Sequence, residues 1–233
     1  MPSTKRKKEE ESGDLSSKRA ASSSSAEGWR VVRCAAKDAA TRKQQGNSRS
    51  PMSKPECTSV ELRREGVVGW ARGGLFGLLP DRKIEDFNNY RSQGDSHKGF
   101  SPGTNDRAVM LVCDSVYAEL REALPVAPAV HDGDIGENLL IAGPAYAAGR
   151  DLRVGTQLRV GTAVLELTEP NNPCYRMGFL PWAKHAKARF GEKWWESPAL
   201  PLSKEAHPGG RGWLCKVVVE GTVRPGDGVV KLR

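Results

Sequence analysis

The chain has 233 residues, a formal net charge of +8 and 38% hydrophobic residues. This length is enough for one domain with a substantial core. No apolar run approaches the roughly 20 residues that a membrane-spanning helix needs, and the N-terminus is too acidic and too polar for a secretory or organelle-targeting peptide. The composition therefore excludes a protein with membrane-spanning helices and predicts a soluble protein of the cytosol.

The first 28 residues differ in composition from the rest. They contain a basic run at 5–8, an acidic run at 9–11 and a serine run at 22–25, with almost no large apolar side chain. Such a segment cannot bury enough apolar surface to fold, so residues 1–28 are predicted to be disordered and residues 29–233 to form one domain. The basic run also resembles a nuclear-localisation patch, but the glutamates that follow it argue against that interpretation.

Charge and cysteine spacing narrow the function classes. Residues 1–28 hold six basic and five acidic side chains, so the folded part carries nearly all of the excess positive charge and can attract phosphates, anionic cofactors or nucleic acid. RNA-binding and zinc-finger patterns are absent from the sequence, so nucleic acid is not expected as a partner. The five cysteines form no C-x-x-C pair, which argues against structural zinc and thioredoxin-type motifs, and their odd number is typical of a reducing compartment.

The N-terminal half of the expected domain contains short β-type runs between polar segments. Residues 31–34 and 60–62 are predicted strands, and 37–56 is a predicted loop. Four glycines within 66–74 indicate either a flexible turn or a loop whose backbone amides approach an anion. Residues 78–103 are polar and irregular and are interpreted as an insertion.

A buried strand and a helix follow. The apolar run 108–112 is typical of a strand buried on both faces. Asp114 or Ser115 is the expected cap of the next helix, and Pro125 ends it. One helix face would carry the apolar residues at helical spacing, namely Val116, Leu120 and Leu124.

Residues 131–143, HDGDIGENLLIAG, combine glycines and carboxylates with an apolar run. The glycines predict a turn that presents Glu137 and Asn138 at the mouth of a sheet, just before a strand at 139–141. Taken alone, an ordinary tight turn with solvated acids is the better interpretation.

The segment 157–177 predicts a hairpin followed by a turn that bears a cysteine. Gly161 and Thr162 lie between two β-type runs, where glycine tolerates the positive φ of a tight hairpin turn. The prolines and asparagines of 170–173 then break further strand pairing. Cys174 follows this turn, so its thiol is predicted to be presented rather than packed.

The C-terminal part predicts one more helix and the closing strands. Apolar residues recur at helical spacing within 182–190, with basic residues elsewhere on the wheel. Trp194 and Trp195 are expected to pack in the core, with the lining of a pocket as the alternative. Residues 214–219 read as a strand, and 221–232 add a turn and a closing strand. Many short strands, few helices and frequent glycine turns predict a mainly β, barrel-like domain with a few short helices.

Five motifs, in order, resemble the MOSC domain, the module found at the C-terminus of molybdenum cofactor sulfurases and in free-standing proteins. The third motif resembles the family's pair of strands. The fourth resembles the asparagine–proline–cysteine turn that bears the family's characteristic cysteine, and the fifth resembles its closing V-x-x-G-D turn. The motifs lie at residues 106–109, 133–139, 154–161, 172–174 and 223–227.

One family element departs from the pattern. Members often carry a G-D-x-H-x-G element after the strand that here is 60–62, but residues 69–74 contain neither Asp nor His. Residues 94–99 preserve the residue types at a later position. The anion-contacting role of this element is therefore left open between the two segments.

The resemblance implies a β-rich barrel that binds the molybdenum cofactor or carries sulfur on Cys174. The cysteine would be the catalytic residue and the metal or persulfide-sulfur ligand, since a thiolate performs both tasks. The protein would then reduce N-hydroxylated compounds or transfer sulfur, with a redox or sulfur-donor protein as partner. The cofactor is anionic, so basic side chains would hold its phosphate. The expected cofactor-binding residues are Lys54, Arg107, Glu137, Asn138, Asn172 and Arg176.

Two alternatives stay open. Pyridoxal phosphate serves the family's sulfurases in a separate domain, so it is not expected to bind here. The residues missing from 69–74 are the reason to consider a non-catalytic MOSC-fold module that binds an anion or a protein. Nucleic-acid binding through the N-terminal tail and the basic residues of 184–189 is the third and weakest hypothesis.

Overall fold

The computed structural model describes residues 28–37, 52–71, 82–87, 106–125, 128–143 and 152–233. Strands dominate this part of the chain, as predicted from the many short β-type runs. The predicted disorder of the N-terminal tail and the alternative segment 94–99 lie outside the described residues, as do residues 72–74 of the glycine-rich segment. No helix in the described ranges is long and apolar enough to cross a membrane.

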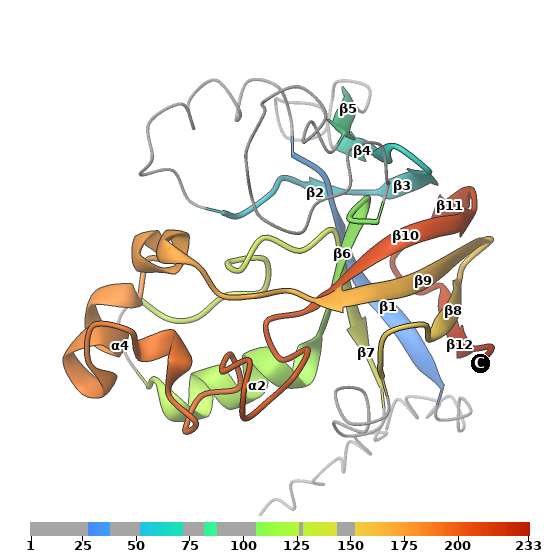
Figure 1. Cartoon of the computed structure of the whole chain (residues 1–233). Coiled ribbons are helices and arrows are strands. Elements are labelled where there is room, and N and C mark those ends of the chain that lie inside the picture. The colour runs from blue at the N-terminus through green and yellow to red at the C-terminus, as the bar shows by residue number, and fades with distance from the viewer. Residues whose placement is uncertain (1–27, 38–51, 72–81, 88–105, 126–127, 144–151) are drawn as a thin grey trace, which may run out of the picture.

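Seven strands close into a barrel (Figure 1). Their order around the barrel is β1 (Trp29–Ala35), β12 (Gly228–Lys231), β8 (Gln157–Val160), β9 (Ala163–Pro170), β10 (Trp213–Val219), β6 (Val109–Cys113) and β7 (Leu139–Ala142). The β1–β12 pair, in which Trp29 lies opposite Val229, closes the ring. Within the ring β6 and β7 run parallel and the other pairs are antiparallel. The predicted barrel-like fold class is therefore confirmed.

The pair β6–β7 is buried on both faces. Leu111 and Ile141 belong to the apolar cluster that fills the barrel, whereas Val112 and Leu140 belong to a second cluster outside it. A strand that packs against apolar side chains on both faces needs a continuous apolar run, because residues that point to either face are buried. This explains why 108–112 lacks polar residues, and it places β6 and β7 between the barrel interior and the helices.

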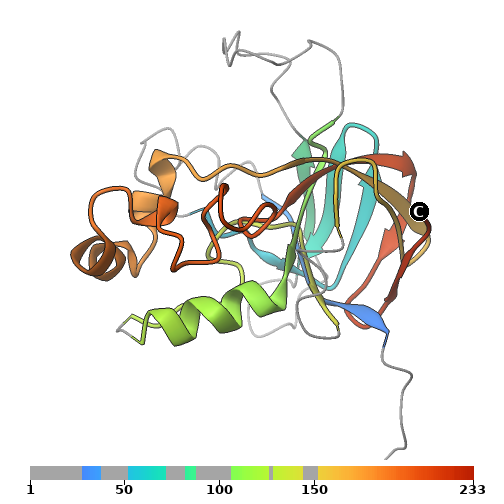
Figure 2. The same ribbon diagram turned by 60° about the horizontal axis from the view of Figure 1, so that its bottom comes forward.

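The helices of the described residues lie together on one side of the barrel (Figures 1 and 2). They are α2 (Asp114–Ala123), η2 (Tyr175–Phe179), α4 (Ala183–Phe190) and η3 (Trp194–Glu196). The predicted helix cap is wrong, because Cys113 occupies the N-cap position of α2, no side chain caps it, and Asp114 is already helical. Trp194 packs in the core as predicted, with its ring centroid 5.2 Å from that of Trp182, and Trp195 is partly buried against the same cluster.

A second, four-stranded sheet corrects two predictions. It consists of β11 (Gly221–Val223), β3 (Ser59–Arg63), β4 (Gly66–Ala71) and β5 (Arg82–Phe87), and the short β2 (Glu56–Cys57) pairs with β1. The described part of the predicted glycine turn is strand β4, and part of the predicted insertion is strand β5. Gly69 lies inside a strand because a Cβ there would lie 2.5 Å from Cys57 Sγ. A glycine in a strand can thus mark close packing instead of a turn.

The predicted hairpin and turn are present. Strands β8 and β9 are joined at Gly161, whose φ is +56°. Strand β9 continues to Pro170, which lies opposite Trp213 of β10, and the chain then leaves the sheet. The turn that follows carries the cysteine to the surface, and Cys174 is exposed.

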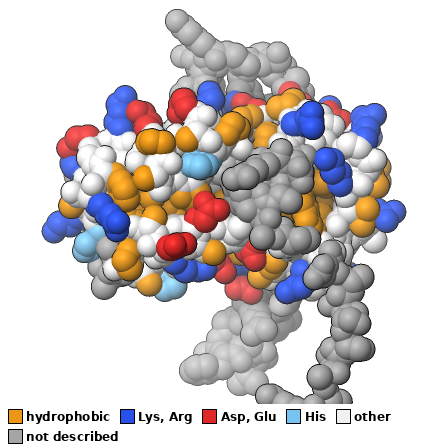
Figure 3. Space-filling model, turned by 90° about the horizontal axis from the view of Figure 1, so that it is seen from below, with side chains coloured by type: hydrophobic (Ala, Val, Ile, Leu, Met, Phe, Trp, Pro, Cys, Tyr) orange, Lys and Arg blue, Asp and Glu red, His pale blue; other side chains and the backbone are white. Residues whose placement is uncertain are grey.

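The surface on the α2 side carries charges of both signs. Figure 3 shows Lys and Arg side chains interspersed with Asp, Glu and apolar side chains over the described part of this face. The predicted basic face of α4 is exposed at Lys184, Lys187 and Arg189, and Lys187 forms an ion pair with Glu192. Part of that basic charge is therefore compensated locally.

Candidate functional site

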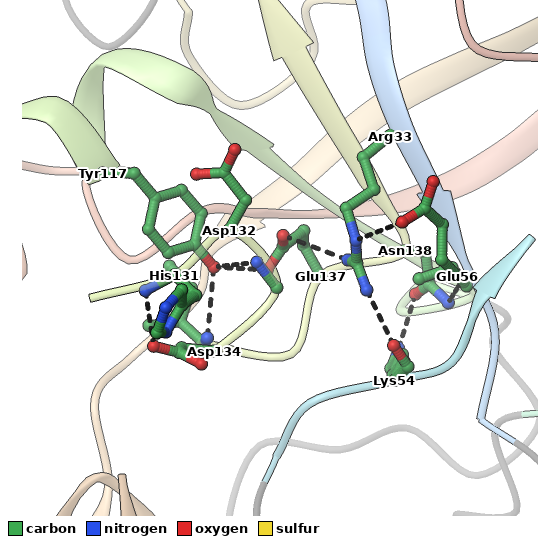
Figure 4. Close-up of polar contacts among 12 residues, drawn as sticks. Arg33, Lys54, Glu56, Tyr117, His131, Asp132, Asp134, Glu137 and Asn138 are labelled. Carbon is green, nitrogen blue, oxygen red and sulfur yellow. Dashed lines mark hydrogen bonds and ion pairs between the residues drawn. The ribbon is translucent and has the colours of Figure 1, made fainter. Parts of the chain in front are cut away.

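A buried carboxylate, Glu137, lies at the centre of a polar cluster between the barrel and α2. Its side chain is fully buried, with Tyr117 on one side and Arg33 on the other (Figure 4). The Tyr117 hydroxyl donates to Glu137 Oε2 at 2.8 Å, and Arg33 Nη1 donates to Oε1 at 3.4 Å. Arg33 Nη2 also donates to the carbonyl oxygen of Lys54 at 2.7 Å. The acid is thus held by partners from β1 and α2.

Tyr117 also fixes the loop that precedes Glu137. Its hydroxyl oxygen accepts the N–H groups of Gly133 at 3.0 Å and Ile135 at 3.1 Å. A phenol has one donor and can accept two hydrogen bonds, so this buried hydroxyl is fully satisfied. The loop is further tied to the helical region, because Trp182 Nε1 donates to Asp134 Oδ2 at 2.9 Å.

Two glycines allow the loop to pack against the cluster. Gly133 has φ +95°, and a Cβ at this position would lie 2.7 Å from Cζ of Arg33. Gly136 has φ +85°, and its Cβ would lie 2.7 Å from the carbonyl oxygen of Met52. Both positions therefore need glycine for the backbone conformation and for the space.

Asn138 joins three segments of chain. Its Oδ1 accepts the backbone N–H of Met110 at 3.1 Å and Lys54 Nζ at 2.9 Å, while its Nδ2 donates to the carbonyl of Ala35 at 3.1 Å. Its own backbone N–H and carbonyl pair with Met110 and Ala35 as well. The side chain thus extends the hydrogen-bonding pattern between β1 and β6.

Burial dominates the electrostatics of this cluster. Burial raises the pKa of Glu137, while the hydrogen bond from Tyr117 and the charges of Arg33 and Lys54 act in the opposite direction. Burial likewise raises the pKa of Tyr117, and the charge of Glu137 adds to the effect. Glu137 is therefore a buried acid that burial drives towards its protonated form, while the adjacent Arg33 and the charge of Lys54 favour its ionised form.

Cys174 is the exposed thiol of the chain. The other four cysteines, at positions 34, 57, 113 and 215, are buried. Burial raises the pKa of Cys34 and of Cys113 to about 12, and it also raises the pKa of Cys215. Those three thiols are thereby kept protonated, and Cys174 is the thiol that solvent can reach.

A buried arginine lies next to the cysteine turn. Arg211 is 6% exposed, and within the described part of the chain its partners are the thioether sulfurs of Met110, 3.5 Å from Nη1, and Met52, 3.6 Å from Nη2. Its Nε has no hydrogen-bond partner there. Burial lowers the pKa of Arg211, against the charges of Cys174, Tyr117 and Glu137.

The structure brings together three of the predicted cofactor-binding residues and separates the others. Lys54, Glu137 and Asn138 belong to one cluster. Glu137 and Asn138 are buried, so their predicted presentation at the mouth of a sheet is wrong, and so is the alternative of a solvated acid at Glu137. The reason is that the loop folds back over Tyr117. Arg107 forms an ion pair with Glu169. Asn172 and Arg176 are exposed on either side of Cys174.

Three residues of the site were not predicted from the sequence, namely Arg33, Tyr117 and Arg211. Arg33 lies within the first predicted strand, and Tyr117 follows the apolar position Val116 in the predicted helix, so neither pattern distinguishes them. A signal for Arg211 does exist. It lies among glycines in the run GGRG at 209–212, which marks a backbone that approaches its neighbours closely.

Most of these residues lie in a part of the chain that matches one protein-family model. A sequence model described as "MOSC domain" matches residues 98–230, which include Glu137, Asn138, Cys174 and Arg211 but not Arg33 or Lys54. No curated protein sequence matches the chain.

Several solved structures are similar at low sequence identity. YiiM from Geobacillus stearothermophilus is 21% identical with a TM-score of 0.42, and the match covers 56% of this chain and 57% of that protein. YuaD from Bacillus subtilis is 15% identical with a TM-score of 0.48, and the match covers 86% of this chain and 95% of that protein. YiiM from Escherichia coli is 15% identical with a TM-score of 0.47, and the match covers 88% of this chain and 70% of that protein. The chain thus aligns with little more than half of the Geobacillus protein.

Proposed function

The chain belongs to the MOSC domain family, and we propose that it binds the molybdenum cofactor, with the Cys174 thiolate as the protein ligand to the metal. The observation that carries this proposal is the exposed thiol of Cys174 beside a buried cationic group, Arg211. When bound, the cofactor would supply oxo transfer at its metal, as in the reduction of N-hydroxylated compounds.

The donor set favours a metal that arrives with ligands of its own. Among the described residues, no group of three or more His, Cys, Asp or Glu side chains could hold a metal ion. A single exposed thiolate is a soft ligand and suits one coordination position. This supports a metal carried by a cofactor over a bare metal ion bound by a protein cage.

The charges around Cys174 suit an anionic cofactor. Arg176 is exposed two residues after the cysteine, and Arg211 lies behind the turn with an orphaned Nε. Guanidinium groups bind phosphate through paired N–H donors. Lys54 belongs to the neighbouring cluster, where its ammonium group contacts Asn138. We assign Arg176, Arg211 and Lys54 as the residues that would neutralise the cofactor.

Sulfur carriage is the second candidate, and the same observation supports it. A persulfide forms on an accessible thiolate, and Cys174 is the exposed cysteine of this chain. A sulfur-donor protein would then be the partner, whereas the oxo-transfer function needs a redox partner. The two candidates differ in whether Cys174 holds a metal or a sulfur atom.

Metal and sulfur analysis of the purified protein separates these candidates. The full chain, Cys174→Ser and the control Cys57→Ala, which removes a buried thiol, are purified from a host that makes the cofactor. We expect molybdenum near one atom per chain in wild type and in the control, and its loss in Cys174→Ser. Persulfide on Cys174 without molybdenum would support sulfur carriage instead. Neither molybdenum nor persulfide after exposure to a sulfur donor would contradict both and favour a non-catalytic binding module.

A further inference from the structure

Cys34 and Cys57 lie directly opposite each other on the antiparallel strand pair β1–β2. Directly opposite residues point to the same face of a sheet, and their Cα atoms are roughly 4.5–5.5 Å apart. Both side chains belong to the apolar cluster that fills the barrel. A disulfide needs a Cα separation of about 4.4–6.8 Å and side chains that do not point apart. The register therefore supplies the geometry of a disulfide between two thiols that are reduced in this structure.

The packing around the two sulfurs leaves room for such a bond. Gly69 of β4 lies so close to Cys57 that a Cβ would be 2.5 Å from its Sγ. Cys34 Sγ donates to the carbonyl oxygen of Val223 at 3.8 Å, and Cys57 Sγ donates to that of Pro55 at 3.7 Å. A thiol is a weak donor, so little hydrogen bonding is lost when the two sulfurs join.

Strand β2 is the part of this pair that can open. It consists of Glu56 and Cys57, and it ends the order of its sheet among the described residues. A two-residue strand at a sheet edge separates locally at a lower free energy than the whole barrel. Burial raises the pKa of the Cys34 thiol to about 12, and the charge of Cys57 adds to the effect, so Cys34 stays protonated while the pair is closed. Cys57 is therefore the thiol that meets an oxidant first.

The segment before Cys57 carries Lys54, which belongs to the buried polar cluster (Figure 4). Lys54 Nζ donates to Asn138 Oδ1 at 2.9 Å, and the carbonyl oxygen of Lys54 accepts Arg33 Nη2 at 2.7 Å. Arg33 immediately precedes Cys34 in β1, and Lys54 lies three residues before Cys57. A covalent bond between the two cysteines would therefore hold Lys54 against the cluster, whereas opening of β2 would release it.

We propose that Cys34 and Cys57 form a reversible disulfide that fixes residues 52–57 to β1 when the surrounding thiols are oxidised. The oxidant is a low-molecular-weight disulfide such as oxidised glutathione. The Cys57 thiolate attacks one sulfur of that disulfide, whose S–S bond breaks, and the released thiolate takes up a proton. Cys34 gives its proton to solvent, attacks the Cys57 sulfur of the mixed disulfide and releases the second thiol. Two protein thiols are thereby oxidised while one small disulfide is reduced to two thiols.

Peptide mass spectrometry of the full chain tests the bond. Cys174→Ser serves as the background, so that the exposed thiol cannot form mixed or intermolecular disulfides. The protein is incubated with oxidised glutathione for hours, blocked with N-ethylmaleimide and digested. We expect a peptide pair linked through Cys34 and Cys57, which dithiothreitol removes, and the same pair in the control Cys215→Ala, whose thiol is buried elsewhere in the barrel. Absence of this pair, or linkage of Cys57 to another cysteine instead, would overturn the proposal.

Thermal unfolding in the same background tests whether the bond fits the native fold. The disulfide closes a loop of residues 35–56, which lowers the entropy of the unfolded chain. We expect the midpoint of the oxidised protein to lie at least about 5 °C above that of the reduced protein. Cys57→Ala should show no such shift, and its own midpoint establishes that this variant folds. An unchanged or lower midpoint in the oxidised protein would mean that the bond strains β1 and β2, which is incompatible with the proposal.

Amide hydrogen exchange tests the consequence for Lys54. In the reduced protein, residues 52–57 exchange through local opening of β2. We expect oxidation to slow the exchange of this segment at least about 10-fold while the amides of β9 keep their rates. Equal rates in the oxidised and reduced proteins would show that the disulfide does not hold the segment in place, against the proposal.

The disulfide does not depend on the proposed function, and only its effect on a bound cofactor, through Lys54, does. The linked peptide pair in a chain that takes up no molybdenum would keep the disulfide and reject the cofactor. Molybdenum bound by a chain in which the linked pair does not form would keep the cofactor and reject the disulfide.

Discussion

Tyr117 and Glu137 are joined by a buried hydrogen bond, in which the phenol donates to Oε2 at 2.8 Å and itself accepts two backbone N–H groups. This hydroxyl is the point at which α2, the loop before β7 and the buried acid meet. Its removal would therefore leave three polar groups without a partner.

Tyr117→Phe is expected to destabilise the protein by about 1–3 kcal/mol, because the ring still fills its space while the N–H groups of Gly133 and Ile135 and one carboxylate oxygen lose their partner. Urea unfolding followed by circular dichroism measures this difference. The control Tyr175→Phe changes a residue that is 63% exposed and should stay within about 0.5 kcal/mol of wild type. A similar small effect for Tyr117→Phe would contradict the role of the hydroxyl.

Gly133→Ala is expected to lower the free energy of unfolding by more than the strain of a positive φ alone explains. Gly133 and Gly226 have φ +95° and +94°, but a Cβ at Gly226 meets nothing within 4 Å, whereas one at Gly133 meets the Arg33 guanidinium. Gly226→Ala should therefore show the backbone cost of about 1–2 kcal/mol. Gly133→Ala should exceed it, because Arg33 must leave Glu137 or Lys54. Equal losses in chemical denaturation would mean that Arg33 adapts freely.

The pH dependence of stability should report the burial of Glu137. Burial raises the pKa of this carboxyl in the folded state, so folding favours its protonated form. Its contribution to stability is fully present below the ordinary carboxyl pKa and falls as the pH rises through the raised value. We therefore expect the difference in free energy of unfolding between wild type and Glu137→Gln to decrease as the pH rises from about 4 to neutral. Denaturant unfolding of both proteins at a series of pH values measures this difference.

Glu166 provides the opposite case as a control. Hydrogen bonds from Lys216 and Gln157 lower the pKa of Glu166, so its contribution is present above the ordinary carboxyl pKa and lost as the pH falls. The free energy of unfolding of wild type, relative to that of Glu166→Gln, should therefore increase as the pH rises. If Glu137 showed this same sign, the ion pair with Arg33 would outweigh burial.

Local patterns in the sequence were sufficient for the barrel strands. The apolar run before α2, the glycine between β8 and β9 and the proline-rich turn before Cys174 act through neighbouring residues, and the structure has each of them. The pattern failed at Gly69, where glycine reflects close packing against Cys57 in another strand. Contacts of that kind depend on the pairing of strands that the sequence does not place next to each other.

The candidate site was only half predictable for the same reason. Glu137 and Cys174 lie in recognisable motifs, but their partners are distant in the sequence. Arg33 lies 104 residues from Glu137, and Arg211 lies 101 residues from Met110. Periodicity tells which face of a strand a residue occupies, and it carries no information on which distant residue it meets. The contacts of Arg33 and Arg211 therefore required the three-dimensional structure, although the glycines at 209–212 mark the position of Arg211 as closely packed.

The thiols are expected to divide into one that reacts and four that do not. Cys174 is exposed, whereas Cys34, Cys57, Cys113 and Cys215 are buried, and burial raises the pKa of Cys34 and Cys113 to about 12. A thiol must reach the reagent as a thiolate to react. Native protein treated with a disulfide reagent at pH 8 should therefore release about one equivalent rapidly, and Cys174→Ser almost none, because only local or global unfolding exposes the others.

Denaturant supplies the internal control for this count. All five thiols should react in guanidinium chloride for wild type and four for Cys174→Ser, which rules out prior oxidation as the cause of a low native count. Cys174→Ser should keep the stability of wild type within about 0.5 kcal/mol, since an exposed side chain contributes little to the core. Rapid reaction of a second native thiol would show that the barrel opens readily, because each of the other cysteines lies inside packed structure.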